Sequence, residues 1–449
     1  MSPNRLATWL CACAAAGCAS PQFRRPIDVR TYASELLGPA DAATAMPPDE
    51  LERSVLSAAE LSLAGAVALA LANRPDLAVA EAEIDLAAAA RVRALLYPNP
   101  EASLTVEHGE TESSQVPQIW LEVAQPIVVS DRRRLGADEA DAEAEAATWE
   151  LFAKRVEVLG AVRDAWLEVA AAQQAVALAG ENVTLARVLQ RVAEIRLQAE
   201  QVPELEVLRA KSEVERANLA VESAEAHLAA ARARLAGAMG VSDGALPPCP
   251  ALPADPPAVP DAAQLETKAL EESFAVRAAQ ARVHAAELAG ERAEAEGIPD
   301  LTVSAGYGQS IEPLAALWTV GLGVPLPLFD RNQGGIAEAQ ALRARAEAEV
   351  AAAEAVIRAE LREASALYAG AVANLRAIRD TVAPLADEAY RRTEIGYAEG
   401  RLDYLSLLEA RRARMEASAA ELEALLDAWL AVVRIESLVG PLTPSEVQP

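Results

Sequence analysis

Apolar residues recur at helical spacing over several very long stretches of this chain. Between residues 137 and 200 no proline interrupts the pattern, which predicts one continuous helix of roughly 90 Å. In two later helices the apolar positions alternate three and four residues apart, and this heptad spacing specifies knobs-into-holes packing between helices. The heptad positions are Val214, Ala217, Val221, Ala224, Leu228, Ala231, Leu235 and Ala238 in one helix, and Met415, Ser418, Leu422, Leu425, Trp429, Val432, Glu436 and Val439 in the other, where Ser418 and Glu436 are polar exceptions. Helices of this length predict a rod or the wall of a tube.

A second pattern, in which apolar and small residues alternate with a period of two, predicts β-strands. It runs from Leu301 to Gly308 and, after a polar loop, from Val320 to Leu328. A half-buried strand of a soluble sheet would show the same alternation. The long helices on both sides leave no globular domain for such a sheet to join. The alternation therefore favours a barrel wall with lipid on one face and a lumen on the other.

Markers at a constant distance indicate that the chain is a tandem duplication. Three pairs lie 199 residues apart: Pro100 and Pro299, Pro126 and Pro325, and Asp131 and Asp330. In each copy the pattern predicts a helix (61–94 or 263–296), two strands, and two long helices joined by a tight turn. The expected organisation is a signal peptide at 1–17, an irregular N-terminal arm at 18–57, a first repeat at 58–244, a proline-rich linker at 245–262, a second repeat at 263–440 and a loose tail at 441–449.

The N-terminus has the features of a secretory signal. Arg5 precedes an apolar run, and small residues stand at the expected cleavage site in the sequence Ala15-Ala16-Gly17-Cys18. Small residues directly before a cysteine also favour a bacterial lipoprotein signal, with cleavage before Cys18 and acylation of its thiol. An ordinary signal peptide with an incidental cysteine is the alternative. After cleavage only Cys18 and Cys249 would remain, so a disulfide framework is not expected.

Charge and composition exclude several classes of function. The formal charge of -27 argues against nucleic acid as a partner, because phosphate binding needs clustered lysine and arginine. The three histidines, His108, His227 and His284, share no ligand spacing, and no phosphate-loop or dinucleotide motif occurs. The sequence therefore predicts no enzyme, no catalytic residue and no metal site. Outside the signal, the best candidate for a membrane-spanning helix, 61–73, is shorter than the ~20 residues that such a helix needs, so a membrane crossing would require a closed β-barrel.

Two motifs carry a family resemblance. The first is VPLPLFDRNQG, from Val324 to Gly334, and the second is YAEG at 397–400 followed by LSLLEA at 405–410. With these motifs the chain resembles the outer-membrane factors of tripartite efflux pumps, which form the TolC family. Within that family it resembles the heavy-metal branch typified by CzcC and CusC. The resemblance covers nearly all of the chain that follows the signal peptide.

The resemblance implies a mainly α fold with a small β part, in which a long α-helical coiled-coil barrel continues a transmembrane β-barrel of the bacterial outer membrane. Each chain of a homotrimer would give four strands to the shared β-barrel, because four strands cannot close around a pore. The implied partners are outer-membrane lipid, a periplasmic adaptor protein and an inner-membrane RND pump that exports heavy-metal cations. No cofactor is implied beyond the lipid on Cys18. The alternatives are a channel for drugs or other organic compounds and, in a different class, a soluble periplasmic coiled-coil scaffold.

The resemblance also places functional residues. Its periplasmic gate carboxylates fall on Ser406 and Glu409, of which only Glu409 is acidic, and Asp403 one turn earlier would take the missing place. The alternative for Glu409 is an ordinary surface glutamate. The turns expected to contact the adaptor are Glu200, Gln201, Val202 and Pro203 in the first repeat and Glu399, Gly400 and Arg401 in the second. The strand-to-helix junction is marked by Pro325, Pro327, Asp330, Arg331, Gln333 and Gly334.

Overall fold

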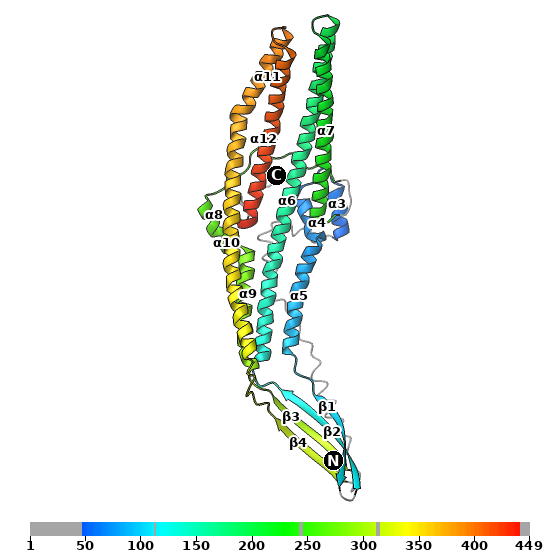
Figure 1. Cartoon of the computed structure of the whole chain (residues 1–449), viewed down its shortest axis with the longest axis vertical. Coiled ribbons are helices and arrows are strands. Elements are labelled where there is room, and N and C mark those ends of the chain that lie inside the picture. Colours follow the sequence, from blue (N-terminus) through cyan, green and yellow to red (C-terminus); the bar gives the residue numbers. More distant parts are fainter. Residues whose placement is uncertain (1–46, 112–113, 242–245, 311–314, 441–449) are drawn as a thin grey trace. The chain divides into compact units, whose positions relative to one another are not determined.

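The computed structural model describes residues 47–111, 114–241, 246–310 and 315–440 (Figure 1). The expected signal peptide, Cys18 and the expected tail lie outside these residues. The described chain is mainly helical, with one four-stranded sheet. It divides into two compact units, and each unit contains segments of both repeats. Within the described residues, the first unit comprises Glu81–Trp149 and Arg277–Ala351, and the second comprises 47–80, Glu150–Val276 and 352–440.

Four antiparallel strands form the sheet of the first unit: β1 (Glu101–Thr111), β2 (Ser114–Ile127), β3 (Leu301–Ser310) and β4 (Ala315–Gly323). Their order is β1-β2-β3-β4, so β2 pairs with β3 although residues 128–300, which include four helices, separate them in the chain. The four expected strands are confirmed. The expected continuation of the last strand to Leu328 is wrong, since β4 ends at Gly323. Pro325 and Pro327 have no amide hydrogen to donate to a neighbouring strand.

One face of the sheet is apolar and exposed on this chain. Residues directly opposite each other in an antiparallel pair point to the same face, and the pair Val303–Leu322 extends the apolar face from β3 to β4. Val320 and Leu322 are 86% and 71% exposed. On β3 the opposite face carries the small residues Ser304, Gly306 and Gly308, and a Cβ atom at Gly308 would lie 2.6 Å from the ring of Trp120 of β2, which occupies that space. The alternation predicted from the sequence is confirmed.

Each repeat begins with a helix that is broken at one residue. In the first repeat α4 (Leu63–Asn73) and α5 (Pro75–Leu95) meet at Arg74, and 199 residues later α8 (Ala262–Glu272) and α9 (Phe274–Glu296) meet at Ser273. Arg74 is extended because the ring of Pro75 disfavours helical backbone in the residue before it. Ser273 is also extended and its hydroxyl accepts a hydrogen bond from Val276 N, as an N-cap does. The expectation of one unbroken helix at these places is therefore wrong.

No single helix in the described part of the chain is long and apolar enough to cross a bilayer. The pair α4 and α5 reaches the required length and composition only when both helices are counted together across the 48° bend between them.

The expected long helices are present. α6 (Arg132–Gln198) runs for 67 residues without a break, which confirms the continuous helix, although it begins before residue 137. It is followed by α7 (Glu204–Met239), and the second repeat has α10 (Gln333–Ala377), α11 (Ala383–Ala398) and α12 (Tyr404–Val439). Two of the heptad positions of α7 pack as expected, since Val214 and Ala217 lie against Val183 and Ala186 of α6.

A π-helical turn, Ile378–Val382, joins α10 to α11 and was not predicted. Pro384 explains it, because a proline inside an α-helix lacks the N–H for the bond four residues back and its ring clashes with that carbonyl, here the carbonyl of Asp380. The wider π-turn relieves this conflict, and the amide of Ala383 bonds the carbonyl of Ile378, five residues back.

Two segments outside the repeats also have a defined structure. α3 (Pro48–Leu56) begins with a proline at its first position, where a missing N–H costs little, and it corrects the expectation that the whole arm is irregular. The proline-rich linker is non-helical from 246 to 261, as expected. Helix side chains bind its backbone: Gln173 bonds both the N–H and the C=O of Cys249, and Trp429 donates to the carbonyl of Pro253.

Candidate functional site

The two helical hairpins of the second unit turn with the same backbone geometry. Glu200 and Gly400 both have left-handed backbone, with φ of +54° and +74°. The following amide closes each turn: Gln201 N donates to Arg196 O at 2.9 Å, and Arg401 N donates to Gly396 O at 2.8 Å. Glycine adopts this conformation freely, whereas Glu200 bears a cost of roughly 1–2 kcal/mol. Among the expected adaptor-contact residues, Val202 is half-buried, and Glu200, Gln201, Pro203, Glu399, Gly400 and Arg401 are exposed.

Asp403 is the N-cap of α12. Its Oδ1 atom accepts hydrogen bonds from Ser406 Oγ at 2.5 Å and from Ser406 N at 3.0 Å. These bonds lower the pKa of the Asp403 carboxyl below its usual value, and a negative charge here also interacts favourably with the helix dipole. The first hairpin has Pro203 at the matching position, with no side-chain cap. The structure thus brings Asp403 and Ser406 together as a capping pair.

Glu409 lies one helical turn after Ser406, and its side chain is exposed on this chain. Side chains three residues apart on a helix are neighbours on its surface. The start of α12 therefore carries two carboxylates, Asp403 and Glu409, which lie one to two turns apart along the helix. The gate role of Glu409 stays a prediction.

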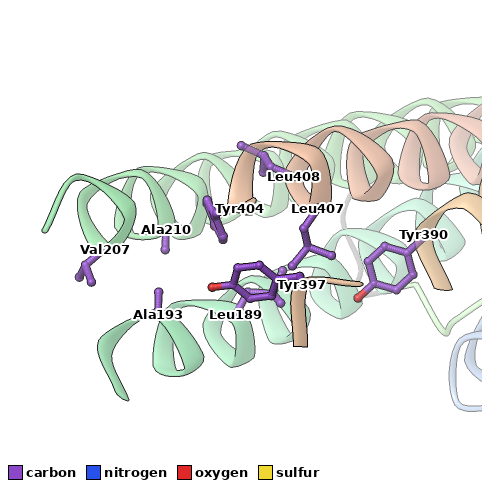
Figure 2. Close-up of a cluster of buried hydrophobic side chains, with 9 residues drawn as sticks. All are labelled: Leu189, Ala193, Val207, Ala210, Tyr390, Tyr397, Tyr404, Leu407 and Leu408. Carbon is purple, nitrogen blue, oxygen red and sulfur yellow. The ribbon is translucent and has the colours of Figure 1, made fainter. Parts of the chain in front are cut away.

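Behind the turns, buried apolar and aromatic side chains join the two hairpins (Figure 2). We call this group the tip cluster. Its members are Leu189 and Ala193 of α6, Val207 and Ala210 of α7, Tyr390 and Tyr397 of α11, and Tyr404, Leu407 and Leu408 of α12. The rings of Tyr397 and Tyr404 meet edge to face, with centroids 6.0 Å apart. Because all four helices contribute, the two hairpins pack as one body at this end.

Tyr397 also links the hairpins by polar contacts. Its hydroxyl donates a hydrogen bond to Glu206 of α7, and its carbonyl accepts one of 2.7 Å from Arg196 of α6. The Arg196 guanidinium lies 4.2 Å from the centroid of the Tyr397 ring. Burial, together with the bond to Glu206, raises the pKa of Tyr397 to about 12, so the hydroxyl is a donor at neutral pH. The sequence motif contains Tyr397 but gave no reason to assign it this role.

A buried charged group lies near the tip cluster. Arg411 is 3% exposed and binds the side-chain oxygen of Asn182, while its Nη1 atom has no hydrogen-bond partner among the described residues. Burial lowers the pKa of Arg411, and the charge of Glu213 opposes this effect. Glu213 is 7% exposed and pairs with Arg412. Sequence reasoning missed this group. Continuing the α12 heptad four residues back from Met415 would have placed Arg411 on the apolar seam, where a charge is unusual.

The strand-to-helix junction of the first unit is closed by its own side chains. Asn332 has left-handed backbone, with φ of +60°, and its N–H donates to Asp330 Oδ1 at 2.9 Å. The Gln333 side chain accepts from Arg331 N at 2.7 Å, and Arg331 Nε donates to Pro327 O at 3.2 Å. These bonds turn the chain from β4 into α10, so the polar residues of the motif have a structural role.

The same junction is tied to the preceding helix in both repeats. The Asn332 side chain donates to Ala293 O of α9 at 2.7 Å, and Arg133, 199 residues earlier, donates to Leu95 O at the end of α5. Gly334 makes no comparable contact, since a Cβ atom there would meet nothing within 4 Å. Its identity is not explained by the structure.

Within the described ranges, no three or more His, Cys, Asp or Glu side chains come together so that they could hold a metal ion. The buried Cys249 thiol has a pKa that burial raises to about 12. A thiol in this state is protonated at neutral pH and is a poor nucleophile or metal ligand. The candidate functional features among the described residues are therefore helix turns, helix caps and packed helix ends.

Comparisons with known proteins agree with this architecture. The family model "Outer membrane efflux protein" matches the chain twice, at residues 66–241 and 265–441. The cobalt-zinc-cadmium resistance protein CzcC of Cupriavidus metallidurans is 27% identical over 391 residues, which cover 86% of this chain and 91% of that protein. CusC, a protein described as forming a transmembrane channel, has a similar fold, with a TM-score of 0.73 at 16% identity over 87% of this chain and 94% of CusC. The outer-membrane channel OprN gives a TM-score of 0.70 at 23% identity over 94% and 98% of the two chains.

Proposed function

Since the chain belongs to the outer membrane efflux protein family, we propose that it is the outer-membrane channel of a tripartite system that exports heavy-metal cations. The exposed apolar face of the sheet is the observation that carries this proposal. A row of side chains such as Val320, which is 86% exposed, is costly in water and is favourable against lipid. The outer edges of β1 and β4 need partners, and further copies of the chain supply them in a closed homotrimeric barrel.

The long helices then form the wall of a periplasmic tunnel. A helix of 67 residues extends for about 100 Å, which is far longer than the interior of a globular domain requires. The hairpin turns at Glu200 and Gly400 lie at the ends of these helices and are exposed, which suits contact with a periplasmic adaptor protein. The channel itself is a passive duct, and an inner-membrane RND pump supplies the energy.

The substrate follows from the relative and from the motifs. CzcC is named for resistance to cobalt, zinc and cadmium, and the junction motif from Val324 to Gly334 resembles that of the heavy-metal branch. The alternative is a channel of the same family that exports drugs or other organic compounds. A passive wall needs no metal ligands, so the residues that line it do not decide between these substrates.

A complementation experiment tests the substrate. Cells that have a cation-type pump and adaptor but lack their own outer-membrane component receive this chain, and growth is measured on zinc, cobalt and cadmium salts and on organic toxicants. Restored metal resistance, lost again with Leu322→Arg, supports the proposal. Restored resistance to organic compounds alone would assign the chain to the competing substrate class. Extraction of the chain without detergent would instead favour the soluble scaffold.

We also propose that Cys18 carries lipid and is the mature N-terminus. The small residues before it support this, and the anchor only tethers the arm, so the sheet should insert without it. Intact mass spectrometry of the purified protein decides between the alternatives: an acyl mass that disappears in Cys18→Ser supports lipidation, and cleavage elsewhere contradicts it.

A further inference from the structure

Trp120 of β2 and Gly308 of β3 form a close pair on the face of the sheet that is opposite to the apolar one. The two residues are direct partners in the antiparallel register, so they share that face. Gly308 is buried, and the indole ring of Trp120 is what covers it. A Cβ atom at Gly308 would lie 2.6 Å from Cε3, 2.7 Å from Cδ2 and 2.8 Å from Cζ3 of the ring.

These three distances define the orientation of the ring. Cδ2, Cε3 and Cζ3 are consecutive atoms of its six-membered part. A point beyond the ring edge would be clearly farther from two of them than from the third, whereas nearly equal distances place the point over the ring face. The bond from Cα to Cβ in a strand residue is directed away from the sheet. The indole ring therefore lies flat over the backbone of Gly308 and does not stand out from the sheet.

Only one side of Trp120 leaves room for this position of the ring. Its partner on the other side is Thr105 of β1, which carries a side chain on the same face. The glycine at position 308 is thus the neighbour over which the ring can lie. Among the described side chains of this face, Trp120 is the only aromatic one. Its orientation therefore decides how far the largest ring of this face extends from the sheet.

Two further pairs on this face have the same composition. Gly306 is the partner of Thr319, and a Cβ atom on it would lie 2.6 Å from Thr319 Oγ1. Gly321 is the partner of Ser304, and a Cβ atom on it would lie 2.5 Å from Ser304 Oγ. Glycine weakens a strand and often marks a close approach of neighbouring atoms. In all three pairs the glycine leaves the space in which its partner's side chain lies along the sheet.

We propose that Gly308 holds the Trp120 ring flat against the lumen wall and thereby sets the bore of the barrel at this level. Because the apolar face of the sheet meets lipid, the face with Trp120 lines the lumen. In a homotrimer three copies of the ring lie at the same level, so rings that stood out from the wall would narrow the lumen from three sides. Trp120 is the lining residue and Gly308 is a positioning residue. The proposal rests on the proposed channel function and adds to it the residue pair that limits the size of what passes.

Planar bilayers that contain the purified full-length protein test the bore. The protein is added to one side of the bilayer, where its long helices remain because they cannot cross it, so the barrel opens to the other side. Neutral polyethylene glycols of graded size are then added on the barrel side alone. A polymer that enters the barrel lowers the single-channel current, and the largest polymer that does so gives the size limit of the bore.

Gly308→Ala should lower this size limit, because the added Cβ atom forces the ring off the wall and into the lumen. When Gly308→Ala is combined with Trp120→Ala, the limit should return to the wild-type value, since no ring remains to be displaced. Trp120→Ala alone should leave the limit nearly unchanged, because a flat ring takes little of the bore. Gly323→Ala is the matched control. Gly323 lies on the same face, and a Cβ atom there would meet Thr302 at an ordinary contact distance of 3.9 Å.

Fluorescence gives a second measurement that depends on the ring itself. Acrylamide quenches the emission of tryptophan side chains that it can reach. The difference between each protein and the same protein with Trp120→Phe isolates the emission of Trp120. This emission should be quenched more strongly in Gly308→Ala than in the wild type, because both faces of a displaced ring are open to water.

Three results would overturn the proposal. The first is a Gly308→Ala protein that conducts with the wild-type size limit. The second is a lowered limit that persists when Trp120→Ala is added. The third is a much higher limit in Trp120→Ala alone, which would show that the wild-type ring already stands in the lumen, and this result decides if Gly308→Ala fails to insert. Each of these results leaves the channel function intact, whereas a wild-type protein that neither inserts nor conducts overturns the channel.

Discussion

The hydroxyl of Tyr397, in the second helical hairpin, donates a hydrogen bond of 2.5 Å to the carboxylate of Glu206, in the first. The two residues lie 191 positions apart in the chain. Tyr397 is buried in the tip cluster, so this bond crosses between the hairpins inside a largely apolar setting. The ends of the two hairpins are therefore coupled by one specific polar contact in addition to apolar packing.

Tyr397→Phe removes the donor of that bond and keeps the ring in the tip cluster. The Glu206 carboxylate then loses a partner in a half-buried position, and we expect a loss of stability of about 1–2 kcal/mol. Thermal unfolding of the detergent-solubilised protein measures it. Glu206→Gln is the matched control, because the amide oxygen still accepts the hydrogen bond and the loss should be smaller. Equal losses in both variants would show that the charge of Glu206 contributes as much to stability as the hydrogen bond does.

Val303 and Leu322 lie directly opposite each other on the apolar face of the sheet. Leu322→Arg or Val303→Arg should impair membrane insertion, by roughly 2–4 kcal/mol for a site near mid-bilayer. Thr302→Arg places the same charge on the opposite face of β3 and should be tolerated better. The amount of folded protein in the outer-membrane fraction measures both effects. Equal tolerance on the two faces would contradict the assignment of the apolar face to lipid.

Asp164 of α6 makes the stability of the folded protein depend on pH. Burial and the nearby charge of Glu168 raise the pKa of this carboxyl from 3.8 to about 6. The folded state therefore binds the proton more tightly than the unfolded state, so the associated stability is full below pH 4 and is lost as the pH rises through 6. Asp164→Asn should remove this loss. The melting temperature of the variant should rise relative to that of the wild type between pH 4 and pH 7. If the two proteins' melting temperatures change with pH in parallel over this range, the prediction is contradicted.

The elements of this fold could be predicted from the sequence where a local pattern determines them. The period-two alternation in 301–308 and the unbroken helical spacing in α6 depend on neighbouring residues alone, and both were confirmed. The break at Ser273 was missed because an isolated serine between two helical patterns resembles any other helical residue. Pro75 carried a usable signal, since proline disfavours helix in the residue before it, but the apolar spacing continues across it and favoured a single helix.

The candidate site was less accessible to sequence reasoning because its contacts join distant parts of the chain. The capping pair Asp403 and Ser406 spans three residues and could have been derived from the preference for aspartate at an N-cap. The bond between Arg411 and Asn182 spans 229 residues. No spacing rule reaches that far, and only the position of Arg411 on an apolar seam indicated a buried charge.

Glu200→Gly and Gly400→Val test the matching turns in opposite directions. Both positions have left-handed backbone, with φ of +54° and +74°. Glycine at position 200 should stabilise the protein by up to about 1 kcal/mol, because it removes the steric cost that Glu200 bears. Valine at position 400 should destabilise the turn, since a β-branched residue resists this conformation. We expect Gly400→Val to weaken export in cells without changing the ion selectivity of the isolated pore. A change in selectivity would place Gly400 in the conducting path.

Glu409 is the residue at which gating by charge can be tested most directly. In a homotrimer, threefold symmetry would bring three copies of its carboxylate towards one axis. Like charges held close raise the cost of ionising one another, and they attract cations. We therefore expect Glu409→Ala and Glu409→Lys to change the single-channel conductance and to lower cation selectivity in planar bilayers. The trimer should assemble normally, because the Glu409 side chain is exposed on each chain.

Asp403→Asn provides the comparison that interprets the Glu409 variants. The Asp403 carboxylate is bound by the amide and the hydroxyl of Ser406, which lower its pKa and keep it charged. Asparagine is also a good N-cap, so this substitution removes the charge and retains most of the cap. If Glu409 forms the charged ring, Asp403→Asn leaves selectivity unchanged. If selectivity instead changes in Asp403→Asn and stays unchanged in the Glu409 variants, the charged ring lies at Asp403, one to two turns closer to the tip. Ser406 then stands at a position where the family resemblance places an acid, and its hydrogen bonds hold the Asp403 carboxylate in position.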